Sequence, residues 1–400
     1  MDWRNGLEGV NLIWTSIGSA LTGLIAAFAL GYKFAEHKLS PRVESLKQES
    51  ARIEADLRQA KRDLSAREPE GVAIGGKPVE DNLLVDDEVN LWLRPVAQSL
   101  PPTRMPILVI ANLKGGVAKT MLAANLATYF SVRGNYPITA KHKNKRVLLV
   151  DLDYQGSLTG MILDAMQPQP GTQHPKHRAQ SLFADSSPSD VLSWRVHPAA
   201  NLPLVSLYPV EYGFDDFEAR QFQMWVSGKQ GDIRFKLGAT LRSQEFQNEF
   251  DLCIIDTGPR LTLGSVAALA AATHLLIPTS PDHRAREAAS RFLRRVSELR
   301  RSGVCPSIKL LGIAATLVTN HNRDFMDAAR KDFGSLIAEP GLEWARGQPD
   351  TSVMLKSELP FSFPIQRAAE QSIPYLATSV IRSTFNPIGE EIELRINHVP

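Results

Sequence analysis

The sequence has little cysteine, almost no net charge and no residue cluster typical of hydrolases or zinc proteins. Its 400 residues include two cysteines, Cys253 and Cys305, which are far apart and belong to no CxxC or Cys/His cluster. This argues against a disulfide framework or a zinc site and fits a reducing cytosol. The formal net charge of +2 argues against a nucleic-acid-binding polycation. No Ser/His/Asp triad can be assigned, and the last tyrosine, Tyr375, stands alone.

Charged residues are also missing from an N-terminal stretch. None occurs between Glu8 and Lys33, a gap of 24 residues. At about 1.5 Å per residue, a helix of this length crosses a hydrocarbon layer of about 30 Å, which predicts a transmembrane helix over residues 9–33. A buried core helix is the alternative. Basic residues gather after the stretch, which argues against a cleavable signal peptide. They predict a single-pass protein of the inner (cytoplasmic) membrane, with the N-terminus outside and the remaining chain in the cytoplasm.

A heptad pattern follows this stretch. Apolar or small residues alternate by three and four positions at Val43, Leu46, Ser50, Ile53, Leu57, Ala60 and Leu64. The pattern predicts a short coiled coil over residues 40–67, and a solvated single helix is the alternative. Residues 68–104 are rich in proline and glycine and contain an acidic patch, so they are expected to form a linker.

The most informative segment is 112–120, which reads Asn-Leu-Lys-Gly-Gly-Val-Ala-Lys-Thr. It lies between an apolar run and a helix-like stretch. A strand, a Gly-rich turn and the start of a helix, in that order, form a geometry that binds phosphate. In such a loop Lys119 reaches the β- and γ-phosphates and the Thr120 hydroxyl ligates Mg²⁺. The segment departs from GxxxxGK[ST] at two positions, because Leu113 and Ala118 replace its glycines.

An additional lysine, Lys114, makes the loop resemble that of the ParA/MinD family of deviant Walker ATPases, which reads KGGVGKT. Two further segments carry the resemblance. Residues 147–159 are similar to the family's second motif, VLLIDLDPQGNLT, and residues 250–259 are similar to its Walker B strand, YDYIIIDTPP. Alternating apolar strands and helices predict a doubly wound, mostly parallel α/β sheet, and we expect this ATPase domain to span residues 105–400.

The resemblance implies ATP and Mg²⁺ as cofactors and a homodimer that sandwiches ATP. Lys114 would neutralise the charge that develops on the phosphates in the opposite subunit. Lys119 would be the second catalytic lysine. Asp151 would support the Mg²⁺ network, Asp153 would orient the attacking water, and Asp256 would hold Mg²⁺ through water. Asn320 would contact the adenine. The expected nucleotide cradle consists of Gly115, Gly116, Val117, Ala118, Lys119 and Thr120.

Two basic segments leave alternatives open. Residues 133–145 look like an insertion relative to the family and could be a solvated loop or touch acidic lipid or nucleic acid. Residues 284–301 carry seven arginines on an amphipathic helix, which could be solvated or could hold DNA nonspecifically.

The functional reading is a membrane-tethered, dimeric ATPase switch that positions or regulates a partner, with an operon-encoded protein as the expected partner. Three alternatives remain. One is a protein kinase-like enzyme resembling bacterial tyrosine kinases, although the tyrosine-rich tail of those kinases is missing. Another is a nucleotide-binding scaffold with little hydrolysis, because Ala118 adds a methyl group where backbone must approach phosphate. The third is a DNA-partitioning ATPase.

Overall fold

The computed structural model describes residues 91–96, 99–136, 141–166, 178–196, 201–210, 213–346 and 352–398. The expected transmembrane helix, the coiled coil and the linker up to residue 90 lie outside these ranges. Within the ranges, no helix has both the length and the apolar character needed to cross a bilayer.

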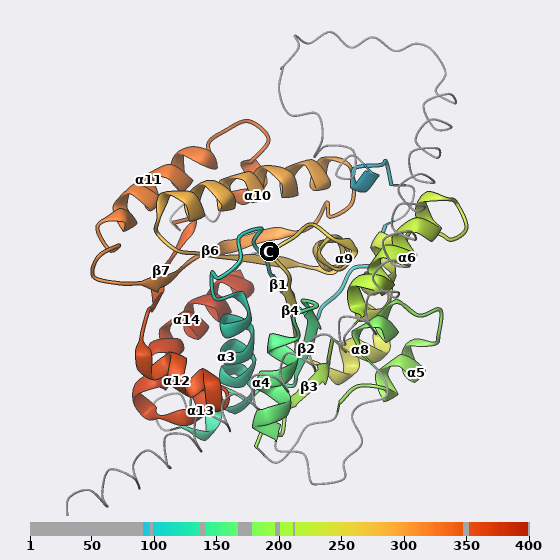
Figure 1. The fold of residues 1–400 in the computed structure, drawn as a ribbon. Helices are drawn as coiled ribbons and strands as arrows, with labels where there is room; N and C mark the ends of the chain where they lie inside the picture. Colours follow the sequence, from blue (N-terminus) through green and yellow to red (C-terminus); the bar gives the residue numbers. More distant parts are fainter. Residues whose placement is uncertain are drawn as a thin grey trace, which may run out of the picture. The chain divides into compact units, whose positions relative to one another are not determined.

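Seven strands form one parallel sheet in the order β3-β2-β4-β1-β5-β6-β7 (Figure 1). The strands are β1 (Ile107–Ile110), β2 (Val147–Leu152), β3 (Val205–Tyr208), β4 (Leu252–Thr257), β5 (His274–Thr279), β6 (Lys309–Val318) and β7 (Met354–Pro360). The expected parallel α/β sheet is therefore confirmed. Because β1 lies between β4 and β5, the loop that follows it lies at the middle of the carboxyl edge, where open α/β sheets bind ligands.

Helices cover both faces of the sheet (Figure 1). One face carries α9 (Leu263–Ala271), α10 (His283–Arg301) and α11 (Phe325–Leu336), and the other carries α3 (Lys119–Val132), α4 (Ser157–Met166) and α14 (Ser379–His398). The remaining α-helices are α5 (Pro188–Ser193), α6 (Phe214–Val226), α7 (Lys236–Leu241), α8 (Gln244–Glu249), α12 (Phe363–Gln371) and α13 (Pro374–Ala377).

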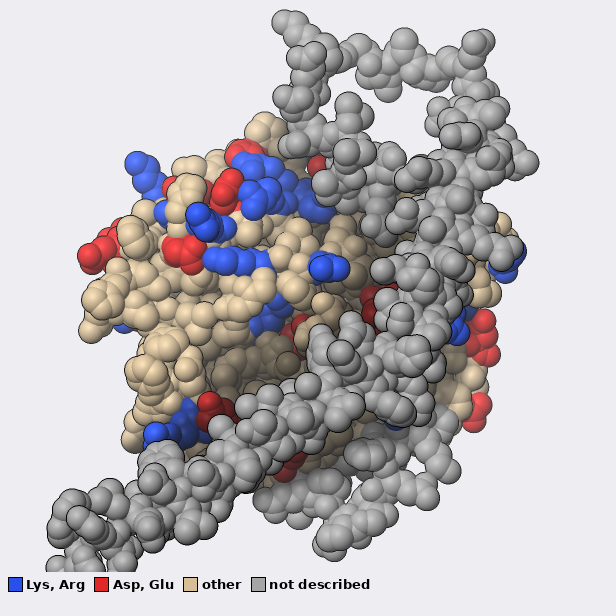
Figure 2. Space-filling view, viewed as in Figure 1, with Lys and Arg blue, Asp and Glu red and all other residues tan. Residues whose placement is uncertain are grey.

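The arginine-rich segment 284–301 forms most of α10, and acidic side chains neutralise much of it. Figure 2 shows red carboxylates among the blue side chains over this region. Four ion pairs are present: Arg286–Asp332, Arg291–Glu287, Arg294–Glu339 and Arg295–Glu298. Arg300 instead stacks on Trp344, with its guanidinium carbon 4.8 Å from the ring centroid. Of the seven arginines, Arg284 and Arg301 are exposed and have no ion pair with any described residue, so the helix presents less uncompensated charge than its sequence indicates.

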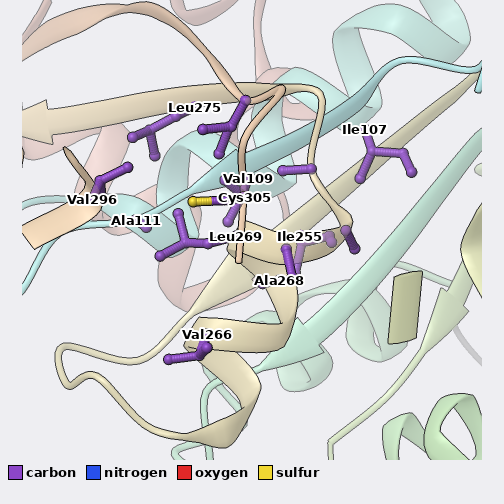
Figure 3. Packing of buried hydrophobic residues seen from close by; sticks show 14 of the residues in the cluster. Ile107, Val109, Ala111, Ile255, Val266, Ala268, Leu269, Leu275, Val296 and Cys305 are labelled. Carbon is purple, nitrogen blue, oxygen red and sulfur yellow. The ribbon is translucent and has the colours of Figure 1, made fainter. Parts of the chain in front are cut away.

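Each strand divides its side chains between two apolar cores. In β1, Ile107 and Val109 pack on the side of α9 and α10, whereas Leu108 and Ile110 pack on the side of α3. Successive side chains of a strand point to opposite faces, so a strand covered on both sides must be apolar throughout. Figure 3 shows the first of these cores, in which Cys305 lies among aliphatic side chains and has no visible chemical role.

The domain begins earlier than residue 105. Trp92 is 3% exposed and stacks on Trp225, with ring centroids 5.6 Å apart. The buried Arg234 donates to the backbone carbonyls of Trp92 and Arg94 at 2.7 and 2.8 Å. Residues 91–94 therefore belong to the folded domain, and the expected linker 68–104 is shorter at this end.

Part of the basic segment 133–145 is bound to the C-terminal helix, whereas Lys141 and Lys143 are exposed. Arg133 is 2% exposed and forms two hydrogen bonds to the carboxylate of Glu393 in α14. Lys145 Nζ lies 3.1 Å from the same carboxylate, and His142 Nδ1 lies 3.5 Å from it. These basic residues therefore tie the C-terminal helix to the end of α3 instead of forming a free basic surface.

Candidate nucleotide site

The loop between β1 and α3 has the backbone conformations of a phosphate cradle. Gly116 and Ala118 have φ values of 70° and 60°, both in the left-handed region. Ala118 stands at the N-cap of α3, where no side chain caps the helix and no acidic residue occupies the first turn. The N–H groups that begin α3 therefore have no side-chain acceptor, which suits an anion.

Lys119 points into this loop. Its Nζ donates to the carbonyl oxygen of Lys114 at 3.0 Å, and the residue is 6% exposed. Burial lowers the pKa of Lys119, while the carboxylates of Asp256 and Asp153 act in the opposite direction. The ammonium group is thus enclosed by the loop with two carboxylates nearby.

Asp256 is the penultimate residue of β4 and lies beside Thr120. The Thr120 hydroxyl donates to Asp256 Oδ2 at 2.7 Å, whereas Oδ1 is buried and has no hydrogen-bond partner. Burial, and then the negative charge of Asp151, raise the pKa of Asp256 well above its usual value. An orphaned carboxylate oxygen beside a hydroxyl is a fit for Mg²⁺, which typically takes one or two protein oxygens together with phosphates and water. Among the described residues, no group of three or more His, Cys, Asp or Glu forms a complete metal cage.

Asp151 is the register partner of Asp256 on the neighbouring strand β2. Both of its oxygens already have donors. Oδ1 accepts from the backbone N–H of Asp153 at 3.0 Å, and Oδ2 accepts from the N–H and the hydroxyl of Thr159 at 2.9 and 2.7 Å. Burial raises the pKa of Asp151 to about 6. The geometry therefore gives Asp151 a clear part in shaping the loop after β2 and makes it a less suitable Mg²⁺ contact than Asp256.

Asp153 follows β2 and lies against the backbone that follows β4. Its Oδ1 accepts from the N–H of Gln155 at 3.1 Å. A Cβ placed on Gly258 would lie 3.4 Å from the same oxygen, so Gly258 leaves space for this carboxylate. The structure thus brings Asp151, Asp153 and Asp256 to the edge of the sheet that also carries Lys119.

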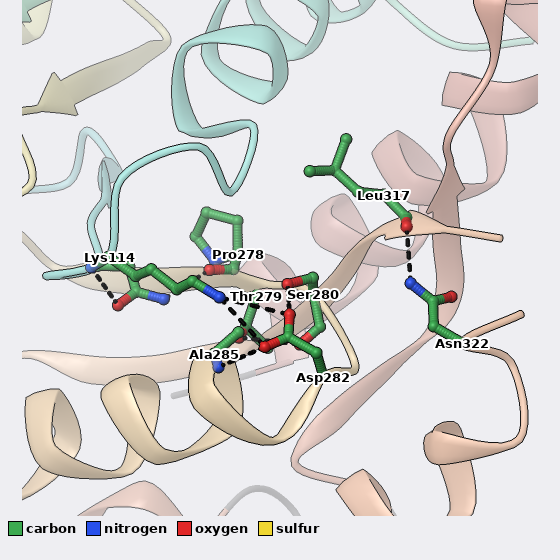
Figure 4. Close-up of polar contacts among 9 residues, drawn as sticks. Lys114, Pro278, Thr279, Ser280, Asp282, Ala285, Leu317 and Asn322 are labelled. Carbon is green, nitrogen blue, oxygen red and sulfur yellow. Dashed lines mark hydrogen bonds and ion pairs between the residues drawn. The ribbon is translucent and has the colours of Figure 1, made fainter.

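Lys114 forms an ion pair within its own chain (Figure 4). Its Nζ lies 3.2 and 3.4 Å from the two carboxylate oxygens of Asp282. Asp282 is the N-cap of α10, where it also accepts from the N–H of Ala285 at 3.0 Å and from the Ser280 hydroxyl. Lys114, which is expected to contact ATP in the opposite subunit, therefore forms an ion pair with the partly exposed Asp282 of its own chain.

The expected adenine contact, Asn320, lies exposed in the turn after β6. Its neighbour Asn322 shapes that turn, donating to the carbonyl of Leu317 at 3.1 Å and accepting from the N–H of Thr319 at 2.7 Å (Figure 4). The same strand reaches the phosphate loop, because the Thr316 hydroxyl donates to the carbonyl of Val117 at 3.1 Å. This end of β6 is thus connected to the nucleotide site, although no side-chain contact singles out Asn320.

Sequence reasoning missed three polar residues that organise the site, namely Asp282, Thr159 and Glu218. Glu218 accepts from the Thr262 hydroxyl at 2.7 Å and from the N–H of Gly264 at 2.5 Å, at the start of α9. Burial raises the pKa of Glu218 to about 7. Thr159 ends the motif-like segment 147–159 and Asp282 precedes a helix as a typical N-cap residue, but neither signal indicates which group the side chain contacts.

Comparisons with known proteins agree with this geometry. The model of the AAA_31 family, described as an AAA domain, matches residues 105–310, which is more than half of the chain. The chromosome-partitioning ATPase Soj of Thermus thermophilus is 29% identical over 211 residues, which cover 52% of this chain and 68% of Soj. The chromosome partitioning protein ParA of Myxococcus xanthus is 29% identical over 211 residues, covering 53% and 64%. A putative replication protein A of Rhizobium rhizogenes is 27% identical, and the chain spans about half of it, 46%.

Solved structures share the fold. Apo McdA of Cyanothece superposes with a TM-score of 0.54 at 22% identity, covering 73% of this chain and 100% of McdA. A ParA of pNOB8 bound to nonspecific DNA gives a TM-score of 0.52 at 20% identity, covering 74% and 100%. Together with the phosphate loop, the uncapped start of α3 and the carboxylates beside Lys119, the family match leads to one conclusion. The chain belongs to the AAA_31 family and is a P-loop ATPase of the ParA/MinD type.

Proposed function

We propose that the protein is an ATP-hydrolysing dimeric switch that positions or regulates a partner. The observation that carries this proposal is the pairing of an uncapped helix start at Ala118 with the orphaned oxygen of Asp256. The first suits an anion and the second suits a cation, so together they fit ATP with Mg²⁺.

The chain's residues divide the work of phosphoryl transfer, which is mostly positioning and electrostatic stabilisation. The loop N–H groups and Lys119 hold the phosphates. Thr120 and Asp256 hold Mg²⁺, which neutralises phosphate charge when it is bound. Asp151 supports this arrangement through Thr159, and Asp153 orients the attacking water.

Dimerisation on ATP requires Lys114 to leave Asp282. Their side chains are 32% and 44% exposed, and exposed ion pairs stabilise by only about 0.2–1 kcal/mol. Contacts with ATP in the opposite subunit can offset that amount, so the ion pair within one chain is compatible with a role for Lys114 across the dimer.

The membrane tether is part of the same proposal. The charge-free stretch over residues 9–32 supports the expected single-pass anchor, residues 9–33, in the cytoplasmic membrane with the ATPase domain in the cytoplasm. The heptads over residues 40–67 support a second, ATP-independent dimer contact. An operon-encoded protein is the proposed partner.

DNA partitioning is the second candidate, and the names of the partitioning relatives support it. The ion pairs that neutralise α10 weigh against that helix as a DNA-binding surface. The kinase-like alternative has less support, because the relatives named above are partitioning proteins, and the scaffold alternative has less support, because the carboxylates of Asp153 and Asp256 lie near Lys119.

Steady-state ATP turnover of the full-length protein tests the proposal. Lys119→Ala should abolish ATP-dependent behaviour, and Asp153→Ala should bind ATP, accumulate as a dimer and lose turnover. Lys331→Ala is the matched control, because Lys331 is an exposed lysine of α11 outside the phosphate loop. Equal turnover in Lys119→Ala and Lys331→Ala would overturn the assignment.

A further inference from the structure

A second concave site lies at the amino edge of the sheet, opposite the phosphate loop. Its walls come from the segment that leads into β1 and from the first residues of β5 and β6, His274 and Lys309. The cavity has a volume of about 360 Å³, and Met105 and Ile396 supply apolar lining. Small-molecule sites are of this size and typically combine apolar walls with a few polar groups.

The charged groups that line this cavity are all basic. Arg104, Arg242 and Lys309 contribute side chains, and no carboxylate of the described residues is part of the lining. Arg104 donates to the neutral side chain of Asn248 at 2.6 Å. Among the described residues, the lining therefore offers basic side chains and no carboxylate.

Arg242 is 6% exposed, so its charge is held inside the protein. Its Nε, Nη1 and Nη2 donate to the carbonyl oxygens of Ala271, Pro101 and Ala272 at 3.1, 3.0 and 3.2 Å. A guanidinium has five N–H groups, so one remains on each terminal nitrogen. Burial lowers the pKa of Arg242. A buried cation that meets only neutral carbonyl groups is costly unless an anion completes its surroundings.

His274 gives an independent indication of a ligand. It is 7% exposed, and its Nε2 is buried with no hydrogen-bond partner. Its Nδ1 lies 2.8 Å from the Thr273 hydroxyl, which also lies 3.1 Å from the carbonyl oxygen of Ile107. A hydroxyl that donates to Nδ1 leaves the ring proton on Nε2, and one that donates to Ile107 leaves it on Nδ1. In either tautomer Nε2 is a buried hydrogen-bonding group without a partner among the described residues. Burial, and then the nearby Lys309, lower the pKa of His274 to about 4, so the ring is neutral near pH 7.

We propose that this cavity binds the phosphate group of a small anionic ligand, with Arg104, Arg242 and Lys309 as cationic partners and His274 Nε2 as a further hydrogen-bonding partner. Arginine forks match phosphate oxygens in geometry. A phosphate monoester carries a charge of about −1.5 to −2 at pH 7 and offers three acceptor oxygens, so it can meet several of these cations at once. The phosphate can belong to a soluble compound or to a lipid headgroup.

The test is calorimetric titration of the full-length protein in detergent with inorganic phosphate, after the nucleotide site has been saturated with a non-hydrolysable ATP analogue and Mg²⁺. Wild-type protein should bind phosphate, and Arg104→Gln should bind about tenfold more weakly, as expected for the loss of one partly exposed charged hydrogen bond. Arg291→Gln is the matched control, because it removes the same charge from an exposed side chain of α10. No binding by wild-type protein, or equal affinity of the two variants, would overturn the proposal.

A second variant tests the contact with His274. His274→Ala removes the hydrogen bond at Nε2 and should bind phosphate more weakly than wild type in the same titration; equal affinity would contradict the contact with Nε2. Competition by phosphatidic acid in the micelles would identify a lipid headgroup as the source of the phosphate, and its failure would identify a soluble compound.

Discussion

Replacing Glu393 with glutamine tests how strongly charge holds α14 to the helix that follows the phosphate loop. Burial raises the pKa of this carboxyl, but the hydrogen bonds from Arg133 and Lys145 outweigh burial and hold the pKa at about 2, against 4.5 for an ordinary glutamate. The difference of roughly 2.5 units, at about 1.4 kcal/mol per unit, corresponds to roughly 3 kcal/mol of stability at pH 7.

The sign of the pH dependence follows from the lowered pKa. A carboxyl whose pKa is lower in the folded state stabilises the fold above its unfolded pKa, and this contribution is lost as the pH falls toward the folded value. Between pH 7 and pH 3, the stability difference between wild type and Glu393→Gln should therefore shrink from roughly 3 to roughly 1.4 kcal/mol.

Urea unfolding of the full-length protein, followed by tryptophan fluorescence at both pH values, measures this difference. Glu287→Gln is the control, since it removes a carboxylate from an exposed ion pair with Arg291 and should cost less than about 1 kcal/mol. A difference for Glu393→Gln that is the same at pH 7 and pH 3, or no larger than that of the control, would refute the reasoning.

Three further outcomes are expected. Asp282→Asn keeps the cap of α10, because asparagine caps as well as aspartate, but loses the ion pair with Lys114; ATP-driven dimerisation measured by light scattering should tighten by up to about fivefold. Lys114→Ala should block that ATP-driven step and leave any association through the N-terminal segments intact. Ala118→Gly should remove about 1 kcal/mol of backbone strain, visible as a higher unfolding midpoint, and should raise ATP turnover, since phosphate can then approach the backbone more closely.

The local parts of the site could be predicted from the sequence, and the long-range parts could not. The phosphate loop and the strand-end aspartates are contiguous motifs, so their positions at the carboxyl edge follow from the parallel sheet. The partner of Lys114 is 168 residues away, and that of Arg133 is 260 residues away. Neither pairing leaves a periodic or spaced pattern in the chain. The domain boundary near Trp92 could not be predicted either. The segment contains proline and looks like a linker in the sequence, whereas in the structure the Trp92 ring is buried in the core.

The left-handed backbone at Ala118 has a consequence for the kinetics of the nucleotide site. The conformation is held by contacts within the chain itself, including the bond from the N–H of Leu122 to the carbonyl of Ala118 at 3.0 Å and the bond from the Thr316 hydroxyl to the carbonyl of Val117. The backbone strain of about 1 kcal/mol at Ala118 therefore lowers the stability of the folded domain and is not a cost of binding. The loop is preorganised for the nucleotide. Entry and release of ATP then require no reordering of the loop, so a slow, rate-limiting rearrangement has to involve other groups. Lys114, which must exchange Asp282 for a new anion, is the group in the loop best placed to set that rate.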